Sequence, residues 1–142
     1  MKILRPIIIL LFVGSAVALT AWFYVNKSHR DIESESALFS VSVDDILNEF
    51  RSDESGSLQK YFDKVVILEG TLEQVIQTQT GNRTVVLYGS SGIANCELSK
   101  GEEIPSSLSI PNQIHVKGLV TGYDDLLGEV KLREGSIIKN DQ

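Results

Sequence analysis

The first part of the chain is dominated by a long apolar segment. Residues 7–25 (IIILLFVGSAVALTAWFYV) contain no charged side chain, and Lys2 and Arg5 precede them. Nineteen residues in a helix with a rise of about 1.5 Å per residue reach about 28 Å, close to the ~30 Å hydrocarbon core of a bilayer. The pattern therefore predicts one membrane-spanning helix, preceded by a cytoplasmic N-terminus at 1–6 and followed by a polar neck at 26–41.

The charges around this segment predict its orientation. Lys2, Arg5 and the terminal amine precede it, and Lys27 and Arg30 follow it. A very short N-terminal stretch before a first apolar run usually behaves as a signal anchor, with the N-terminus inside. We therefore expect the rest of the chain to be extracytoplasmic, which means periplasmic in a Gram-negative cell.

A cleaved signal peptide is the competing interpretation. The two basic residues before the run would then form the charged region, residues 7–13 the apolar core and Ala16-Val17-Ala18 the cleavage site. The apolar run continues beyond this site, however, and Trp22 and Tyr24 near its end are typical of an aromatic belt at the membrane interface. This continuation favours the uncleaved anchor.

A short amphipathic helix is predicted after the neck. Ser42 stands three residues before Asp45, which is a capping pattern, and helical spacing follows at Val43, Ile46, Leu47 and Phe50. The helix is expected to falter around residues 52–57, where Gly56 costs about 1 kcal/mol relative to alanine inside a helix. A second short helix or a continuation of the first would then offer an apolar face made of Leu58, Tyr61 and Phe62.

Five segments then alternate between apolar and polar positions with a period of two, which is typical of strands with one buried face. They are residues 65–76, 83–88, 93–98, 113–123 and 129–138, with turns at 80–82, 89–92 and 124–128 and a connector at 99–112. The inward positions are expected to be Val66, Leu68, Leu72, Ile76, Ala94, Cys96, Leu98, Ile114, Val116, Gly118, Val120, Val130 and Leu132. Gly70 is expected to mark a bulge or bend in the first strand.

The order of these strands predicts the architecture. Three strands in an antiparallel meander, a connector and a terminal hairpin are typical of a small barrel that removes exposed strand edges. In the hairpin, positions whose numbers sum to about 250 should face each other, which places Lys117 opposite Arg133. We predict a mainly β protein: a five-stranded OB-fold barrel at 42–139 with an N-terminal amphipathic helix, preceded by one transmembrane helix and followed by a tail at 140–142.

The charge balance bears on the partners of the barrel. Residues 44–142 contain nine Lys and Arg against sixteen Asp and Glu, a net charge of −7, while the whole chain carries −6. Proteins that bind nucleic acids draw most of their affinity from contacts of Lys and Arg with phosphates. The acidic balance therefore opposes a nucleic-acid partner.

The sequence offers few residues for catalysis or for a metal. Cys96 is the only cysteine, so no intramolecular disulfide can form, and we expect it to be a small buried apolar residue, with a reactive thiol as the alternative. His29 and His115 are isolated, so there is no metal-ligand motif. No nucleophile motif and no glycine-rich phosphate loop is present, and we expect a non-enzyme without a cofactor.

Two groups of residues are candidates for binding. Ligands of OB-folds usually lie on the face of the second and third strands, beside the loops that here span 77–83 and 123–127. That region holds Arg83, Tyr88, Asn95 and Tyr123. The tyrosines could stack on a ring and Arg83 could pair with an anion; alternatively, the tyrosines simply cover the barrel rim.

The second candidate is a basic stripe on the last two strands, formed by His115, Lys117, Lys131 and Arg133. It is the only concentration of positive charge that the pattern predicts in the barrel. Such a stripe could meet an acidic partner or the anionic surface of a membrane, or it could be the solvated face of a hairpin. Glu129 and Glu134 beside it reduce the local positive field.

Three segments of the chain carry a family resemblance: residues 26–31 (NKSHRD), residues 60–66 (KYFDKVV) before Glu69-Gly70, and residues 116–123 (VKGLVTGY). The chain resembles the small bacterial envelope proteins with a tRNA-anticodon-binding-like OB domain, the OB-fold lipoproteins. The resemblance implies the same fold as the periodicity. Its relatives often carry Cys near Val120 and Gly135; this chain does not, so no disulfide, metal role or lipid attachment is carried over.

These observations lead to one functional expectation and two alternatives. We expect a membrane-anchored, non-catalytic binding or interaction module of the cell envelope, whose partner is an envelope protein or a small ligand. The alternatives are a single-stranded nucleic-acid-binding OB domain and a structural subunit of a membrane complex.

Overall fold

The computed structural model describes residues 14–16, 19–20, 32, 34–79, 81–106 and 108–138. Residues 14–16 and 19–20 are helical, and Thr20 Oγ1 donates a hydrogen bond to the Ala16 carbonyl at 3.0 Å. Within the described residues, no helix has both the length and the apolar character needed to cross a membrane. Most of the predicted span at 7–25 lies outside these residues, as do the predicted N-terminus at 1–6 and the tail at 140–142.

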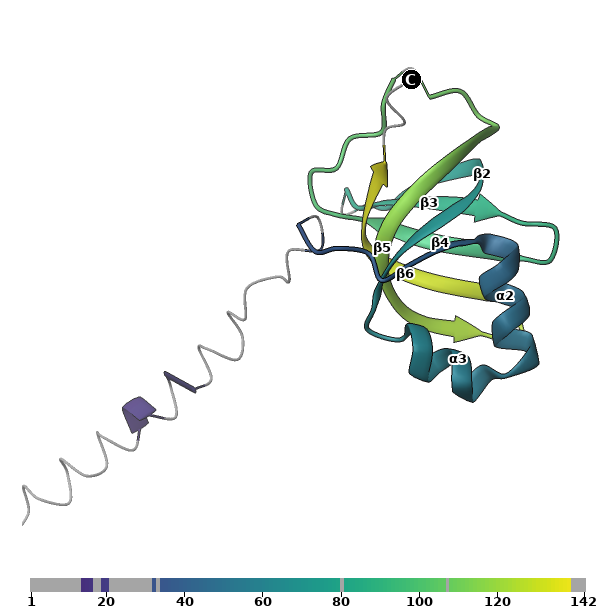
Figure 1. Ribbon diagram of the computed structural model, residues 1–142. Coiled ribbons are helices and arrows are strands. Elements are labelled where there is room, and N and C mark those ends of the chain that lie inside the picture. The colour runs from purple at the N-terminus through teal and green to yellow at the C-terminus, as the bar shows by residue number, and fades with distance from the viewer. Residues whose placement is uncertain are drawn as a thin grey trace, which may run out of the picture. The chain divides into compact units, whose positions relative to one another are not determined.

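A closed barrel forms the centre of the described region. Its strands are β2 (Val65–Gln77), β3 (Arg83–Tyr88), β4 (Ile93–Leu98), β5 (Asn112–Asp124) and β6 (Glu129–Ile138). They follow the order β2-β3-β4-β6-β5, and β2 also pairs with β5, which closes the ring (Figure 1). All neighbours are antiparallel except β4 and β6. The predicted mainly β, five-stranded OB-like barrel is confirmed, with strand ends within one residue of those predicted.

A further strand, β1 (Phe39–Ser42), precedes the barrel. It pairs in parallel with β2, with Phe39 opposite Val66 and Ser42 opposite Glu69. The sequence pattern assigned residues 39–41 to the polar neck, because four residues are too few to show a period of two. The chain therefore joins the sheet before α2 begins.

The helices α2 (Val43–Ser52) and α3 (Glu54–Tyr61) lie at one end of the barrel (Figure 1). Ser42 caps α2 as predicted, since its Oγ accepts a hydrogen bond from Asp45 N at 3.0 Å. The break between the helices falls at Asp53, within the predicted range 52–57. Asp53 N donates to the Glu49 carbonyl at 2.9 Å and the Asp53 carboxylate accepts from Gly56 N at 2.9 Å, so one residue ends α2 and begins α3.

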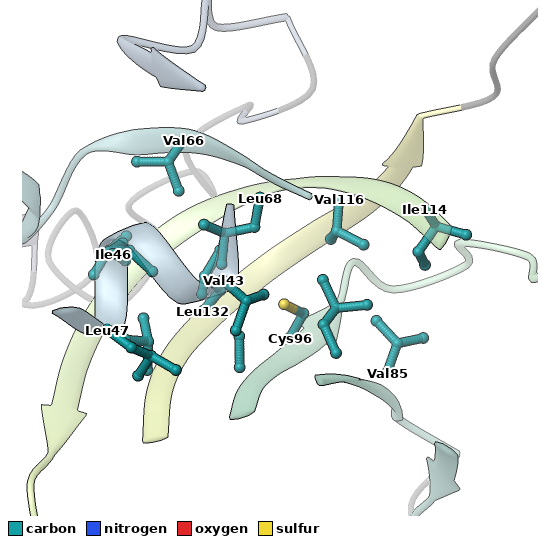
Figure 2. Close-up of a cluster of buried hydrophobic side chains, with 14 of the residues drawn as sticks. Val43, Ile46, Leu47, Val66, Leu68, Val85, Cys96, Ile114, Val116 and Leu132 are labelled. Carbon is teal, nitrogen blue, oxygen red and sulfur yellow. The ribbon is translucent and has the colours of Figure 1, made fainter. Parts of the chain in front are cut away.

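The core lies between α2 and the inner surface of the barrel. Figure 2 shows Val43, Ile46 and Leu47 of α2 together with Cys96 and Leu132 from the strands. Nearly all of the predicted inward side chains are buried here: Val66, Leu68, Leu72, Ala94, Cys96, Leu98, Ile114, Val116, Val120, Val130 and Leu132. Burial raises the pKa of the Cys96 thiol to about 12, so Cys96 behaves as the small apolar residue that was predicted.

Two expected positions in the core are wrong. Ile76 is 42% exposed, because the register of β2 against β3 shifts between Leu72 and Gln74 and turns the later even positions outward. Phe62, assigned to the apolar face of the second helix, is 53% exposed, because α3 ends at Tyr61 and the chain turns away.

The predicted register of the last hairpin is also wrong. Lys117 faces Ser136, and Arg133 faces Leu119. The facing numbers sum to 252 or 253, because the turn occupies residues 125–128 and the ladder is irregular between Lys117 and Leu119 and again between Val120 and Gly122. The predicted inward positions Val116, Val120, Val130 and Leu132 nevertheless stay buried.

Candidate functional site

A groove with a volume of about 290 Å³ lies on the outside of the barrel. It crosses β3, β4 and β6, with contributions from the end of β2 and from β5. The lining residues are Ile76, Thr84, Asn95, Glu97, Thr121, Glu129, Lys131, Leu132 and Arg133. This is the face of the second and third barrel strands on which OB-folds usually bind their ligands.

Asn95 lies in the middle of this groove. Ala94 and Cys96 on either side of it point into the core, so the alternation of β4 turns Asn95 outward, between Val86 of β3 and Lys131 of β6. Its Oδ1 is buried and has no hydrogen-bond partner within the described part of the chain. Leaving a buried acceptor unpaired costs about 1–3 kcal/mol, so a ligand that donates a hydrogen bond there would recover that cost.

The charged side chains of the groove are arranged in opposing pairs. Arg133 Nε lies 3.5 Å from Glu97 Oε2, and Lys131 Nζ lies 3.6 Å from Asp124 Oδ2 and 3.9 Å from Glu129 Oε1. Each cation thus has a carboxylate within 4 Å. The groove therefore offers polar side chains of both signs and no surplus of positive charge.

The other three predicted ligand residues are not in this groove. Arg83, at the start of β3, donates from Nη1 to the Glu102 carbonyl at 3.2 Å and so holds the connector. Tyr88, at the far end of β3, borders a separate hollow beside Asp44. Tyr123 stacks on Phe50 of α2, with ring centroids 4.7 Å apart. The four predicted ligand residues therefore lie at several separate places, and only Asn95 belongs to the groove.

The predicted basic stripe is divided in the same way. Lys131 and Arg133 line the groove with Asn95, but His115 and Lys117 do not. His115 Nε2 lies 3.7 Å from Glu69 Oε2 across the β2–β5 pair, and Lys117 faces Ser136. Lys131 and Arg133 thus belong to the mixed-charge groove that contains Asn95, whereas His115 and Lys117 lie outside it.

Sequence reasoning missed several groove residues. Glu97 and Thr121 were expected on outer faces by alternation, which was the one signal available for them. Ile76 was expected in the core. Glu129 was expected beside the basic stripe and not as a groove residue; it is only 7% exposed and lies 3.9 Å from Lys131 Nζ. Among the described residues, no group of three or more His, Cys, Asp and Glu could hold a metal ion.

A closed five-stranded barrel with helices at one end and a polar groove on its outside surface defines an OB-fold domain. The chain belongs to the tRNA_anti-like family, whose model matches residues 1–134. The family match confirms the resemblance to the tRNA-anticodon-binding-like OB domains, and the domain shares their fold. No curated protein matches the sequence.

Solved structures with the same fold include a proposed nucleic acid-binding lipoprotein of Klebsiella pneumoniae. It is 16% identical, with a TM-score of 0.56, and the match covers 79% of this chain and 100% of that one. The asparaginyl-tRNA synthetase of Entamoeba histolytica (15% identity, TM-score 0.41) and a protein of Leishmania major assigned as an aspartyl-tRNA synthetase (10%, 0.45) match over 56% and 87% of this chain. This chain spans only 22% and 26% of those two longer chains.

Proposed function

We propose that this protein is a membrane-anchored, non-catalytic binding module of the bacterial cell envelope. Residues 7–25 serve as a single span with the N-terminus in the cytoplasm, and the OB domain is extracytoplasmic. The uncharged run of nineteen residues and the basic residues before it support this placement. The family match begins at residue 1 and so includes the apolar segment.

The groove around Asn95 is the proposed binding site, and the unpaired Asn95 Oδ1 is the observation that carries it. The ligand is a small polar molecule or a segment of an envelope protein that donates a hydrogen bond to this oxygen. Because Lys131 and Arg133 already have carboxylate partners, a neutral or zwitterionic ligand fits better than a polyanion. An anion would have to compete with those carboxylates.

Extraction of the full chain in mild detergent tests the binding role. We expect a bound molecule or a cross-linked protein that is lost in Asn95→Ala and retained in Asn48→Ala, a matched change of an exposed asparagine on α2. Native mass spectrometry and a series of cross-linker doses provide the readout. Recovery of the chain alone at every dose, with no ligand, would contradict the proposal.

The placement in the membrane has its own test. A topology reporter fused to the C-terminus should be active only outside the cytoplasm, and the full chain should stay in the membrane fraction at alkaline pH. A cytosolic reporter, or full-length chain in the aqueous fraction with residues 1–25 still attached, would contradict the anchor.

A single-stranded nucleic acid is the second candidate ligand. The anticodon-binding-like family and the two cations of the groove favour it, whereas the charge of −7 on residues 44–142 opposes it. Fluorescence anisotropy of the full chain with DNA and RNA oligonucleotides at low salt distinguishes the two candidate ligands. A flat titration is expected; salt-dependent binding that is lost in Arg133→Ala would favour the second candidate.

A further inference from the structure

The turn between β5 and β6 carries two adjacent, strongly exposed leucines. Leu126 is 91% exposed and Leu127 is 66% exposed, the highest fractions among the large hydrophobic side chains of the described residues. Single exposed apolar side chains are ordinary, but contiguous ones mark interaction sites. We call residues 125–128 the leucine tip; it joins the arrowhead of β5 to the start of β6 (Figure 1).

The leucine tip is held in place at both of its ends. Asp124 Oδ1 accepts a hydrogen bond from Leu127 N at 3.2 Å, and Asp124 Oδ2 lies 3.6 Å from Lys131 Nζ. At the other end Gly128 has a φ of 60°, and its carbonyl accepts from Ile93 N at 3.1 Å. A turn fixed in this way presents its side chains with little further loss of conformational entropy on binding.

The base of the leucine tip is packed against α2 and the turn at 89–92. A Cβ on Gly92 would collide with the Gly128 carbonyl oxygen and meet Leu47 Cδ1 at 3.0 Å. The Arg51 guanidinium donates a hydrogen bond to the Ser91 carbonyl beside it. These groups fill the space at the base of the tip.

We infer that the leucine tip docks into an apolar pocket of a partner protein, and that the rim of this pocket is positively charged. Asp125 is exposed next to the leucines, and residues 44–142 carry a net charge of −7. A second copy of the chain or an anionic lipid surface would repel this charge, whereas a basic rim would attract it. The inference goes beyond the proposed function, because Leu126 and Leu127 do not line the groove.

Site-specific photocrosslinking in the full chain, in its own membrane, tests this inference. The photoreactive residue p-benzoylphenylalanine replaces Leu126, Leu127 or, as a control, Ile110, which is 50% exposed on the connector. We expect one discrete protein adduct from the tip positions, about tenfold above the control. The cross-linked peptide of the partner should contain apolar residues with Lys or Arg next to them.

Companion changes decide whether the adduct depends on the chemistry of the tip. With the probe at Leu127, both Leu126→Ser and Asp125→Lys should lower the adduct about tenfold. Melting temperatures should shift by less than about 2 °C, since both side chains are exposed. An adduct with phospholipid or with a second copy, an adduct insensitive to both changes, or a yield equal to that at Ile110 overturns the inference.

The same experiment keeps this inference apart from the groove. Asn95→Ala should leave the tip adduct unchanged, because Asn95 lines the groove and not the tip. If the unmodified groove binds its ligand but the tip positions give no adduct, the docking inference alone is overturned. Loss of the groove ligand with the tip adduct intact overturns the proposed groove alone.

Discussion

The ring of Tyr123 in β5 stacks on the ring of Phe50 in α2, with the centroids 4.7 Å apart and 16° between the ring planes. The ring centroid of Phe50 also lies 6.0 Å from that of Tyr61, the last residue of α3. These aromatic rings join both helices to the barrel. Tyr123 therefore has a structural role in this protein, and one of its ring faces is already covered.

Replacing Tyr123 tests this role. Tyr123→Ala should lower the free energy of unfolding by about 2 kcal/mol, because it removes the stacked ring and exposes part of Phe50. Tyr123→Phe keeps the ring and should change stability by less than about 0.5 kcal/mol. Urea unfolding measures both. Loss of groove binding in a stable Tyr123→Phe variant would contradict a purely structural role.

Asp53 gives a second prediction, because its backbone ends α2 and its carboxylate begins α3. Asp53→Ala should cost about 1–2 kcal/mol of stability, as expected for a lost helix cap. Asp53→Asn retains an acceptor oxygen and should cost much less. Equal destabilisation by the two changes in urea unfolding would show that capping is not the reason.

The third prediction concerns stability at alkaline pH. Burial raises the pKa of Tyr61 above its usual 10.0; Lys60 beside the hydroxyl opposes this rise, and the hydrogen bond that the hydroxyl donates to Glu49 Oε2 at 3.0 Å adds to it. Since the folded pKa is higher than the unfolded one, the neutral phenol stabilises the fold fully below about pH 10, and this contribution is lost as the pH rises through the raised pKa.

Tyr61→Phe should therefore lose less stability than the wild type as the pH rises above about 10. Tyr88→Phe, a change at the rim of a surface hollow, is the matched control. Chemical unfolding at several pH values gives the comparison. Identical alkaline losses in Tyr61→Phe and the wild type would contradict the assignment.

The fourth prediction separates binding from stability at Asn95. Asn95→Val removes a buried oxygen that has no partner and places a β-branched residue in a strand, so the free energy of unfolding should rise by about 1 kcal/mol. Binding at the groove should be lost in the same variant. A stability loss above about 1 kcal/mol would show that Asn95 supports the fold instead.

The strands were predictable because each has one face in the core. Burial at Ile114, Val116 and Val120 imposes the period of two that the sequence displays. Where local geometry interrupts that period, prediction fails. The register shift after Leu72 exposes Ile76, and the four-residue β1 is too short to show any period.

The candidate site was predictable only in part. Alternation alone placed Asn95 on the outer face of the barrel. It could not show that Tyr123 is covered by Phe50, or that Arg83 holds the Glu102 carbonyl, because those contacts join segments far apart in the sequence. The OB-fold indicates which face of the barrel binds ligands. The side chains that line this face depend on bulges and loop contacts, which the fold class does not specify.

The parallel pairing of β1 with β2 has a mechanical consequence. A force pulling on the N-terminal side of the domain reaches β1 first, through the Leu38 N to Val65 carbonyl hydrogen bond of 2.8 Å and the ladder that follows it. It passes from there to β2, which is bonded to β1, β3 and β5. Tension on the leading segment is thus spread over the most connected strand of the barrel before either helix is loaded.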